Sequence, residues 1–233
     1  MRTVIDFHSH ILPGIDDGSE TAEMSEQMLE LSKEQGIGAI AATPHFYAGQ
    51  TTLDAFLKKR EAAFLKIRDA AVRCGIDLFL GAETAFFPGI GNADGVRHLT
   101  IDGTSLLLLE MPFREWTRRD VEELEKLTAR GLTPLLAHIE RYFSCQKDRK
   151  IIAELYSLPV LGQVNAGALL SWRTRRLALK LFVHDMAHLL GSDCHNVSSR
   201  SPNLARGRSV IEERLGSSCL FQIDRLGKEV FGL

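Results

Sequence analysis

The sequence predicts an α/β fold in which a parallel sheet is covered by helices. Its apolar residues gather in short uninterrupted runs rather than in alternating patterns, which is typical of strands buried on both faces. Longer amphipathic stretches separate these runs; in one of them Leu53, Phe56, Leu57 and Phe64 recur at helical spacing. Strands that alternate with helices in this way indicate parallel βα units.

Seven strands are expected along the chain, at Val4–Phe7, Ile37–Ala42, Ile76–Ala82, Leu106–Leu109, Leu132–Ala137, Pro159–Val164 and His188–Gly191. Glycines at positions 36, 75 and 131 mark the ends of helices before the next strand begins. Two arrangements fit this pattern: a (β/α) barrel one unit short of the usual eight, or a doubly wound sheet. No linker rich in Pro, Gly or Ser divides the sequence, so residues 1–233 are expected to form a single domain.

The composition excludes several classes of protein. With 28 basic and 30 acidic residues the net charge is −2, which does not favour nucleic acid as a partner, because phosphate binding requires a basic surplus. No apolar run approaches the roughly 18 residues of a membrane span, and the start of the chain has no signal-peptide pattern. The four cysteines are scattered without a CxxC pair. We therefore expect a cytoplasmic protein with free thiols and no membrane insertion.

Polar side chains follow most of the predicted strands at the point where each strand ends. Six of the seven ends carry a His, Asp or Glu, namely His8, His10, His45, Glu83, Glu110, His138, Asp193 and His195, and Asp17 lies in the first loop. The carboxyl ends of parallel strands meet at one edge, where ligands bind. One strand-end His or Glu is usually an ordinary loop residue, but six at one edge are improbable as a coincidence.

This set of side chains indicates a metal site. So many carboxylates would repel one another unless cations lay between them. The mixture of nitrogen and oxygen ligands suits Mn²⁺, Fe or Zn²⁺ in a catalytic cluster that retains water, and the lack of paired cysteines argues against a structural zinc site. The remaining histidines, His98, His184 and His188, are interpreted as structural because they lie away from the expected edge.

The same residues, in this order, resemble the PHP (polymerase and histidinol phosphatase) superfamily of metal-dependent phosphoesterases. Within it, the match is best to the bacterial manganese-dependent protein-tyrosine phosphatases of capsule and exopolysaccharide loci. The matching motifs are Asp6–Gly18, Ala42–His45, Gly81–Glu83, Ala137–Tyr142 and Ser192–Asn196. Many metal hydrolases begin with HxH, but HxH followed by IDDG and later by HIERY is specific.

The resemblance implies a distorted seven-stranded barrel that holds up to three Mn²⁺ ions. By position, the first ion would be bound by His8, His10, Glu83 and Asp193, the second by Glu83, Glu110 and His138, and the third by Asp17, His45 and His195. Arg141 and Arg200 match positions that bind the phosphate, and His45 is a further catalytic candidate as a proton donor at the rim. The implied reaction is hydrolysis of phosphotyrosine by a metal-bound hydroxide. The implied partner is a tyrosine-phosphorylated protein, the tail of a membrane-anchored tyrosine autokinase.

Other functions remain open at this point. Cys194 and Arg200 have the C-x5-R spacing of cysteine phosphatases, but the stretch between them lacks the glycine that lets a backbone close around an anion. Cys194 is also a departure from the family's motif, because it lies between two metal-site residues, where a thiol can bind a soft ion.

Histidinol phosphate or another small phosphate ester is an alternative substrate, and amidohydrolase chemistry also starts from HxH on a barrel. A non-catalytic regulator that binds phosphotyrosine is the last alternative.

Three loops are candidates for the walls of a phosphotyrosine pocket. They are Phe46–Thr51, Phe86–Gly91 and Pro112–Trp116, each of which carries an aromatic side chain. Such residues stack on a tyrosine ring if they are exposed, and otherwise cap the hydrophobic core.

Overall fold

The chain alternates strands and helices from end to end. The computed structural model describes residues 4–232. The strands are β1 (Val4–Ser9), β2 (Ile37–Ala42), β3 (His45–Phe46), β4 (Asp77–Leu80), β5 (Glu83–Ala85), β6 (Leu106–Glu110), β7 (Thr133–Leu136), β8 (Leu161–Asn165) and β9 (Leu189–Gly191). The helices are α1 (Ala22–Glu34), α2 (Leu53–Cys74), α3 (Arg118–Ala129), α4 (Arg149–Tyr156), α5 (Ala166–Leu170), α6 (Arg175–Val183), α7 (Leu204–Leu215) and α8 (Ser217–Phe231), with short 3₁₀ turns at Ile90–Asn92, Val96–Leu99 and Ile139–Arg141.

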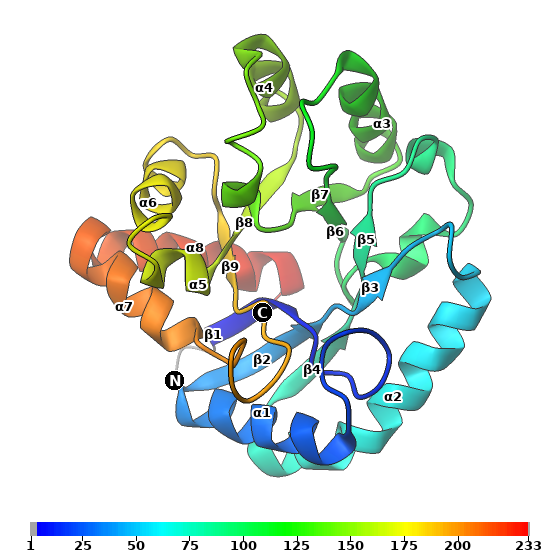
Figure 1. Ribbon diagram of the computed structural model, residues 1–233, viewed down its shortest axis with the longest axis vertical. Coiled ribbons are helices and arrows are strands. Elements are labelled where there is room, and N and C mark those ends of the chain that lie inside the picture. Colours follow the sequence, from blue (N-terminus) through cyan, green and yellow to red (C-terminus); the bar gives the residue numbers. More distant parts are fainter. Residues whose placement is uncertain (1–3, 233) are drawn as a thin grey trace.

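The strands form a parallel sheet curled into a half-barrel, with helices along its outer side (Figure 1). Strand order follows chain order in both parts of the sheet, β1-β2-β4 and β3-β5-β6-β7-β8-β9. The strand order contains no reversal of the kind that defines a doubly wound sheet. The doubly wound alternative is therefore wrong. The first and last strands also meet, because Asp193 N–H donates to His8 O (2.8 Å) and His10 N–H donates to Cys194 O (2.9 Å).

Each of the seven predicted runs contains a strand, but a count of seven strands is not confirmed. Residues 4–232 hold nine, because two short strands, β3 and β5, follow β2 and β4 after a break. Pro44 has no N–H to donate at the first break. Hydrogen bonds from Gly81 N–H to Ala42 O (2.9 Å) and from Glu83 N–H to Pro44 O (3.0 Å) continue the pairing across both breaks.

Helix ends lie where the sequence predicts them. Helix α2 begins after Thr52, whose hydroxyl accepts a hydrogen bond from Ala55 N–H, and ends at Gly75 with φ of 69°. A left-handed backbone conformation of this kind favours glycine, because glycine has no Cβ that would clash with the backbone. Gly36 and Gly131 likewise have positive φ, so all three predicted helix ends are confirmed.

Alternate residues of the strands build an apolar inner core. Its members include Ile5 and Phe7 of β1, Leu106 and Leu108 of β6, and Leu135 of β7. Helix α8 packs against this core: the ring of Phe231 lies 5.7 Å from that of Phe7 and 4.2 Å from that of Phe79. A larger core fills the space between the strands and the outer helices. Apolar packing thus occupies the amino-terminal half of the inner face.

Candidate metal centre

The carboxyl-terminal half of the inner face is polar, and in β6 the change from apolar to polar residues keeps the period of the strand. In β6, Leu106 and Leu108 belong to the inner core and Glu110 follows two residues later. Side chains two apart on a strand share a face, so Glu110 points to the same interior. The structure brings all nine predicted metal-site residues together at this end.

His8 and His10 meet Glu83 and Asp193 in the most deeply buried group. Their Nε2 atoms lie 3.1 and 3.2 Å from Glu83 Oε2, and 3.6 and 3.5 Å from Asp193 Oδ1. The two Nε2 atoms are 3.0 Å apart. All four side chains are at most 5% exposed. This is the set that the family resemblance implies for the first ion.

Glu83 also joins the second group. Its Oε1 lies 2.8 Å from His138 Nε2, which is 3.6 Å from Glu110 Oε1. Its Oε2 lies 3.1 Å from His45 Nδ1. One carboxylate therefore touches four histidines from three other segments, as expected of a bridging ligand.

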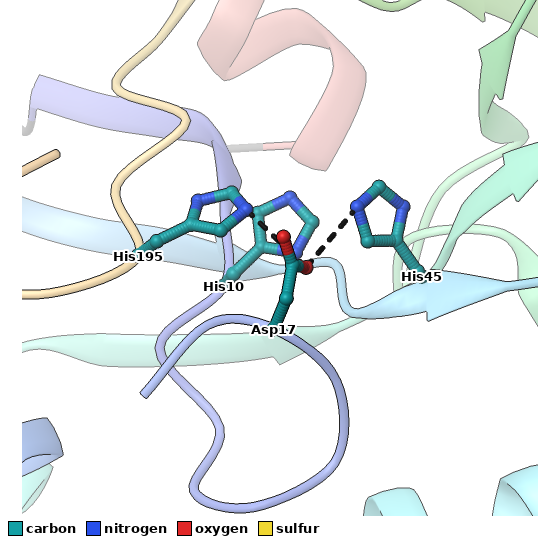
Figure 2. Close-up of side chains that lie close together, drawn as sticks. All are labelled: His10, Asp17, His45 and His195. Carbon is teal, nitrogen blue, oxygen red and sulfur yellow. Dashed lines mark ion pairs between the residues drawn. The ribbon is translucent and has the colours of Figure 1, made fainter. Parts of the chain in front are cut away.

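The third group is the most open to solvent. Asp17 Oδ1 lies 3.5 Å from His45 Nε2 and 3.6 Å from His195 Nε2, and Figure 2 shows these side chains converging beside His10. The side chain of Asp17 is 65% exposed. A cavity of about 460 Å³, lined by Asp17, His45 and Tyr47, opens next to it.

Hydrogen bonds to Nδ1 fix the ring orientation of three histidines. His8 Nδ1 faces Gln163 Oε1 (3.1 Å), His10 Nδ1 faces Asp16 Oδ2 (2.7 Å) and His195 Nδ1 faces the carbonyl of Asp193 (3.0 Å). Because each of these partners is an acceptor, Nδ1 carries a proton and Nε2 is the nitrogen directed into the cluster. The Nε2 atoms of His8 and His10 face each other at 3.0 Å, so they require a shared cation between them, which is a proton in the metal-free protein or a metal ion.

The donor set therefore fits metal ions. The buried Nε2 of His195 and the buried Nδ1 of His138 have no hydrogen-bond partner, and His45 Nδ1, although 3.1 Å from Glu83 Oε2, makes no hydrogen bond to it. Burial and the charge of His10 lower the pKa of His195 to about 4, which keeps its ring neutral and able to bind a metal. Neutral imidazoles and carboxylates are ligands suited to divalent transition ions.

The carboxylates of the centre titrate differently from one another. Burial would raise the pKa of Glu83, but the charge on His8 and the hydrogen bonds from His10 and His138 hold it well below its usual value. The pKa of buried Asp193 is also lowered, by His8, His10 and Arg141. Burial and the negative charge of Glu83 raise the pKa of Glu110 to about 7. The negative charge of the Glu110 carboxylate is therefore unfavourable in the folded protein unless a proton or a bound cation neutralises it.

Arg141 and Arg200 lie at the edge of the centre, on either side of Asp193. Arg141 Nη2 is 2.7 Å from Asp193 Oδ2, and Arg200 Nη2 is 2.8 Å from Asp193 Oδ1. Both side chains remain about two-fifths exposed, at 42% and 40%. They line a second cavity, of about 360 Å³. Each guanidinium thus has further N–H donors free to meet an anion.

Comparison with known proteins identifies the family of this chain. The sequence profile of a family described as capsular polysaccharide synthesis, CpsB/CapC, matches residues 4–226. The chain belongs to the CpsB/CapC family. It is 27% identical over 226 residues to the tyrosine-protein phosphatase CpsB of Streptococcus pneumoniae, with 92% of each chain covered. It is 26% identical to the tyrosine-protein phosphatase YwqE of Bacillus subtilis, covering 94% of this chain and 88% of YwqE.

A solved structure shares the fold of this CpsB/CapC chain. It comes from the crystal structures of YwqE from Bacillus subtilis and CpsB from Streptococcus pneumoniae, described as metal-dependent tyrosine phosphatases. The TM-score is 0.86 at 24% identity, over 98% of this chain and 94% of that one. The α/β fold and the family resemblance predicted from the sequence are confirmed.

Cys194 lies between two centre residues but turns away from them. Its side chain is 1% exposed and belongs to the outer hydrophobic core. Burial and the nearby charge of Asp6 raise the pKa of its thiol, the opposite of what a thiolate nucleophile requires. In this CpsB/CapC chain the C-x5-R spacing is therefore no nucleophile motif.

The three histidines interpreted as structural lie outside the centre. His98 and His184 are exposed, and His188 Nδ1 accepts a hydrogen bond from Gly162 N–H (3.0 Å). His184 ends helix α6 rather than lying within it.

Two polar residues that contact the centre, Gln163 and Asn165, were missed by sequence reasoning, and Asp16 lies in the first loop expected to reach the centre but was given no role of its own. Asp16 accepts hydrogen bonds from His10 Nδ1–H and from His45 N–H (2.9 Å). On β8, Gln163 Oε1 also accepts from His138 N–H (2.8 Å), and Gln163 Nε2–H donates to Asn165 Oδ1 (2.8 Å). Asn165 Nδ2–H in turn donates to Asp193 Oδ2 (2.7 Å). A buried chain of amides thus connects the histidines with Asp193. Leu161, two residues before Gln163, packs against the inner core, so the period of two in β8 could have placed Gln163 on the inner face.

Proposed function

We propose that this protein is a metal-dependent protein-tyrosine phosphatase. The observation that carries the proposal is the convergence of nine His, Asp and Glu side chains on one another beside two half-exposed arginines. Curated relatives in the family are named tyrosine-protein phosphatases, which supports the choice of phosphotyrosine as substrate. The proposed ions are up to three Mn²⁺, with Fe or Zn²⁺ as substitutes, held in the three groups described above.

When bound, the ions would supply an activated water and positive charge at the phosphoryl oxygens. The chain's own part is to hold the phosphoryl group in place. Arg141 and Arg200 are anchored through Asp193, so their remaining N–H groups are fixed in direction when the anion arrives. The leaving phenolate, with a pKa of about 10, needs little help from an acid. His45 is 16% exposed and lines the open cavity; when the third ion is absent, its Nε2 would be free to hold a proton near that oxygen.

The wider assignment follows from the same proposal. We take residues 1–233 as one phosphoesterase domain whose two sheets together act as a distorted seven-stranded barrel. Its substrate is the phosphorylated tail of a membrane-anchored tyrosine kinase, in keeping with the family's description as capsular polysaccharide synthesis, and its location is the cytoplasm. Among the described residues no helix is both long and apolar enough to cross a membrane.

The test uses a phosphotyrosine peptide, a phosphoserine peptide and histidinol phosphate as parallel substrates. We expect hydrolysis of the phosphotyrosine peptide to be lost with EDTA, restored by Mn²⁺, and at least about tenfold faster than that of the other two esters. Cys194→Ser is expected to behave as wild type. Activity that survives EDTA but not the serine substitution would overturn the metal mechanism, and a preference for histidinol phosphate would overturn the substrate.

A further inference from the structure

One exposed aromatic ring stands at the edge of the metal centre. Phe113 lies three residues after Glu110, and its side chain is 54% exposed. Its ring stacks on that of His138, with centroids 6.1 Å apart and an angle of 16° between the planes. Phe113 is one of seven large apolar side chains exposed within residues 4–232, and its ring contacts a residue of the centre.

Packing beneath Phe113 holds the ring in position. It lies 4.9 Å from the ring of Tyr142, which is fully buried and lies 5.5 Å from Trp116. Trp116 is itself buried and donates hydrogen bonds from its ring N–H to Pro112 O (3.2 Å) and from its backbone N–H to Gln146 Oε1 (2.8 Å). One face of the Phe113 ring is therefore supported by a fixed aromatic stack, while the side chain keeps half its surface in water.

The neighbouring residue fixes the loop as well. Arg114 makes two hydrogen bonds to Asp120 at the start of α3, at 2.7 and 2.8 Å. A large apolar side chain in water is unfavourable, and here it is carried by a loop that is tied down on both sides. An exposed ring on a rigid support loses little conformational freedom when another ring stacks on it.

We infer that Phe113 is the platform on which the phenyl ring of the substrate phosphotyrosine stacks; this inference rests on the proposed function. A phosphoryl group bound between the arginines and the ligands of the centre leaves its ester oxygen and ring pointing outward. Phe113 offers an aromatic face next to His138, and aromatic pairs favour such offset contacts. The ring would thereby favour aryl over alkyl phosphates, which makes Phe113 a specificity-determining residue rather than a catalytic one.

The experiment compares two phosphonates that differ only in the ring. Phenylphosphonate and methylphosphonate are used as competitive inhibitors of the Mn²⁺-loaded enzyme acting on a phosphotyrosine peptide. For Phe113→Leu we expect the inhibition constant of phenylphosphonate to rise about 3- to 10-fold, since ring stacking is lost. That of methylphosphonate should stay within about twofold. Phe113→Trp should retain the wild-type ratio, and KM for the peptide should change in Phe113→Leu more than kcat does.

Phe221→Ala is the matched control, because this ring is 48% exposed and lies with Val4 at the amino-terminal end of β1. Equal changes for both phosphonates in Phe113→Leu, or no change for either, would overturn the inference. So would a selective loss in Tyr47→Leu alone, since Tyr47 stacks on His45 across the centre at 5.3 Å. Failure of the proposed function would look different: the wild-type enzyme would not hydrolyse the peptide at all.

Discussion

The two ends of the half-barrel interior differ in chemistry although the same strands build both. Toward the amino ends, Ile5, Phe7 and Leu106 pack on helix α8 in an apolar core. Toward the carboxyl ends, His8 and Glu110 continue the same strands into a buried polar centre. A single strand therefore contributes first to hydrophobic stabilisation and then to chemistry. We therefore expect stability to depend mainly on the apolar end and activity mainly on the polar end. Variants at either end test this separation.

The largest expected effect comes from the middle of the polar end. Glu83 contacts His8, His10, His45 and His138, so Glu83→Gln removes a charge that all three groups use. We expect kcat/KM to fall about a thousandfold, with loss of bound metal. Activity on the phosphotyrosine peptide and metal content by elemental analysis are measured together. Glu61→Gln, on the exposed face of α2, is the control, and more than a tenth of wild-type activity in Glu83→Gln would contradict the bridging role.

A second effect concerns the cost of burying a carboxylate at this end. Burial raises the pKa of Glu140 from 4.5 to about 7. The folded state thus binds this proton more tightly than the unfolded state, so the stability that it contributes is present below pH 4.5 and is lost as the pH rises through 7. Relative to Glu140→Gln, we expect the metal-free wild type to lose about 2 to 3 kcal/mol between pH 5 and pH 8.

The measurement is urea unfolding of both proteins in EDTA across that range. Glu61→Gln again serves as control, because its difference from wild type should not follow the same curve. A wild-type and Glu140→Gln difference that stays constant from pH 5 to pH 8 would show that Glu140 is already ionised in the folded protein.

The apolar end should respond in stability alone. Phe231 of α8 stacks on Phe7 and Phe79, and it is half-buried. Phe231→Ala is expected to lower the free energy of unfolding by about 2 kcal/mol, less than for a fully buried ring. Its kcat/KM at 25 °C should stay within about twofold of wild type, whereas Phe221→Ala should change neither quantity as much. A large loss of activity without loss of stability would show that the two ends are coupled.

Most strands and most residues of the centre could be predicted, because they follow from the pattern of apolar residues and from the position of polar residues at strand ends. Uninterrupted apolar runs indicated the strands, and the His, Asp or Glu residues after six of the seven runs indicated the centre. Strands β3 and β5 were not predicted, because strands of two or three residues are too short to show a period. Their positions depend on pairing across the breaks at Pro44 and Gly81. The roles of the nine centre residues as ligands remain predictions, although the structure brings them together.

The residues that hold the histidines and carboxylates of the centre in position were harder to predict than the histidines and carboxylates themselves. Asp16 stands beside Asp17 in the sequence, and nothing local says which of the two turns inward to His10. Gln163 and Asn165 are neutral amides on the one predicted strand whose end carries no charged residue. Their significance appears only when β8 lies beside β7 and β9, so that Gln163 meets His8 and His138. Loop aromatics such as Phe113 were candidates, but their exposure depends on packing that the sequence does not display.

The smallest expected effect tests that amide chain. Gln163→Leu keeps the side-chain volume but removes the acceptor that orients His8, so we expect metal-free protein to bind Mn²⁺ about tenfold more weakly in calorimetry. Gln27→Leu, on the exposed face of α1, is the control. Affinity within twofold of wild type would mean that burial alone orients the His8 ring. A tenfold loss would instead mean that the polar end needs its own support, because apolar packing from below cannot set the direction of a lone pair.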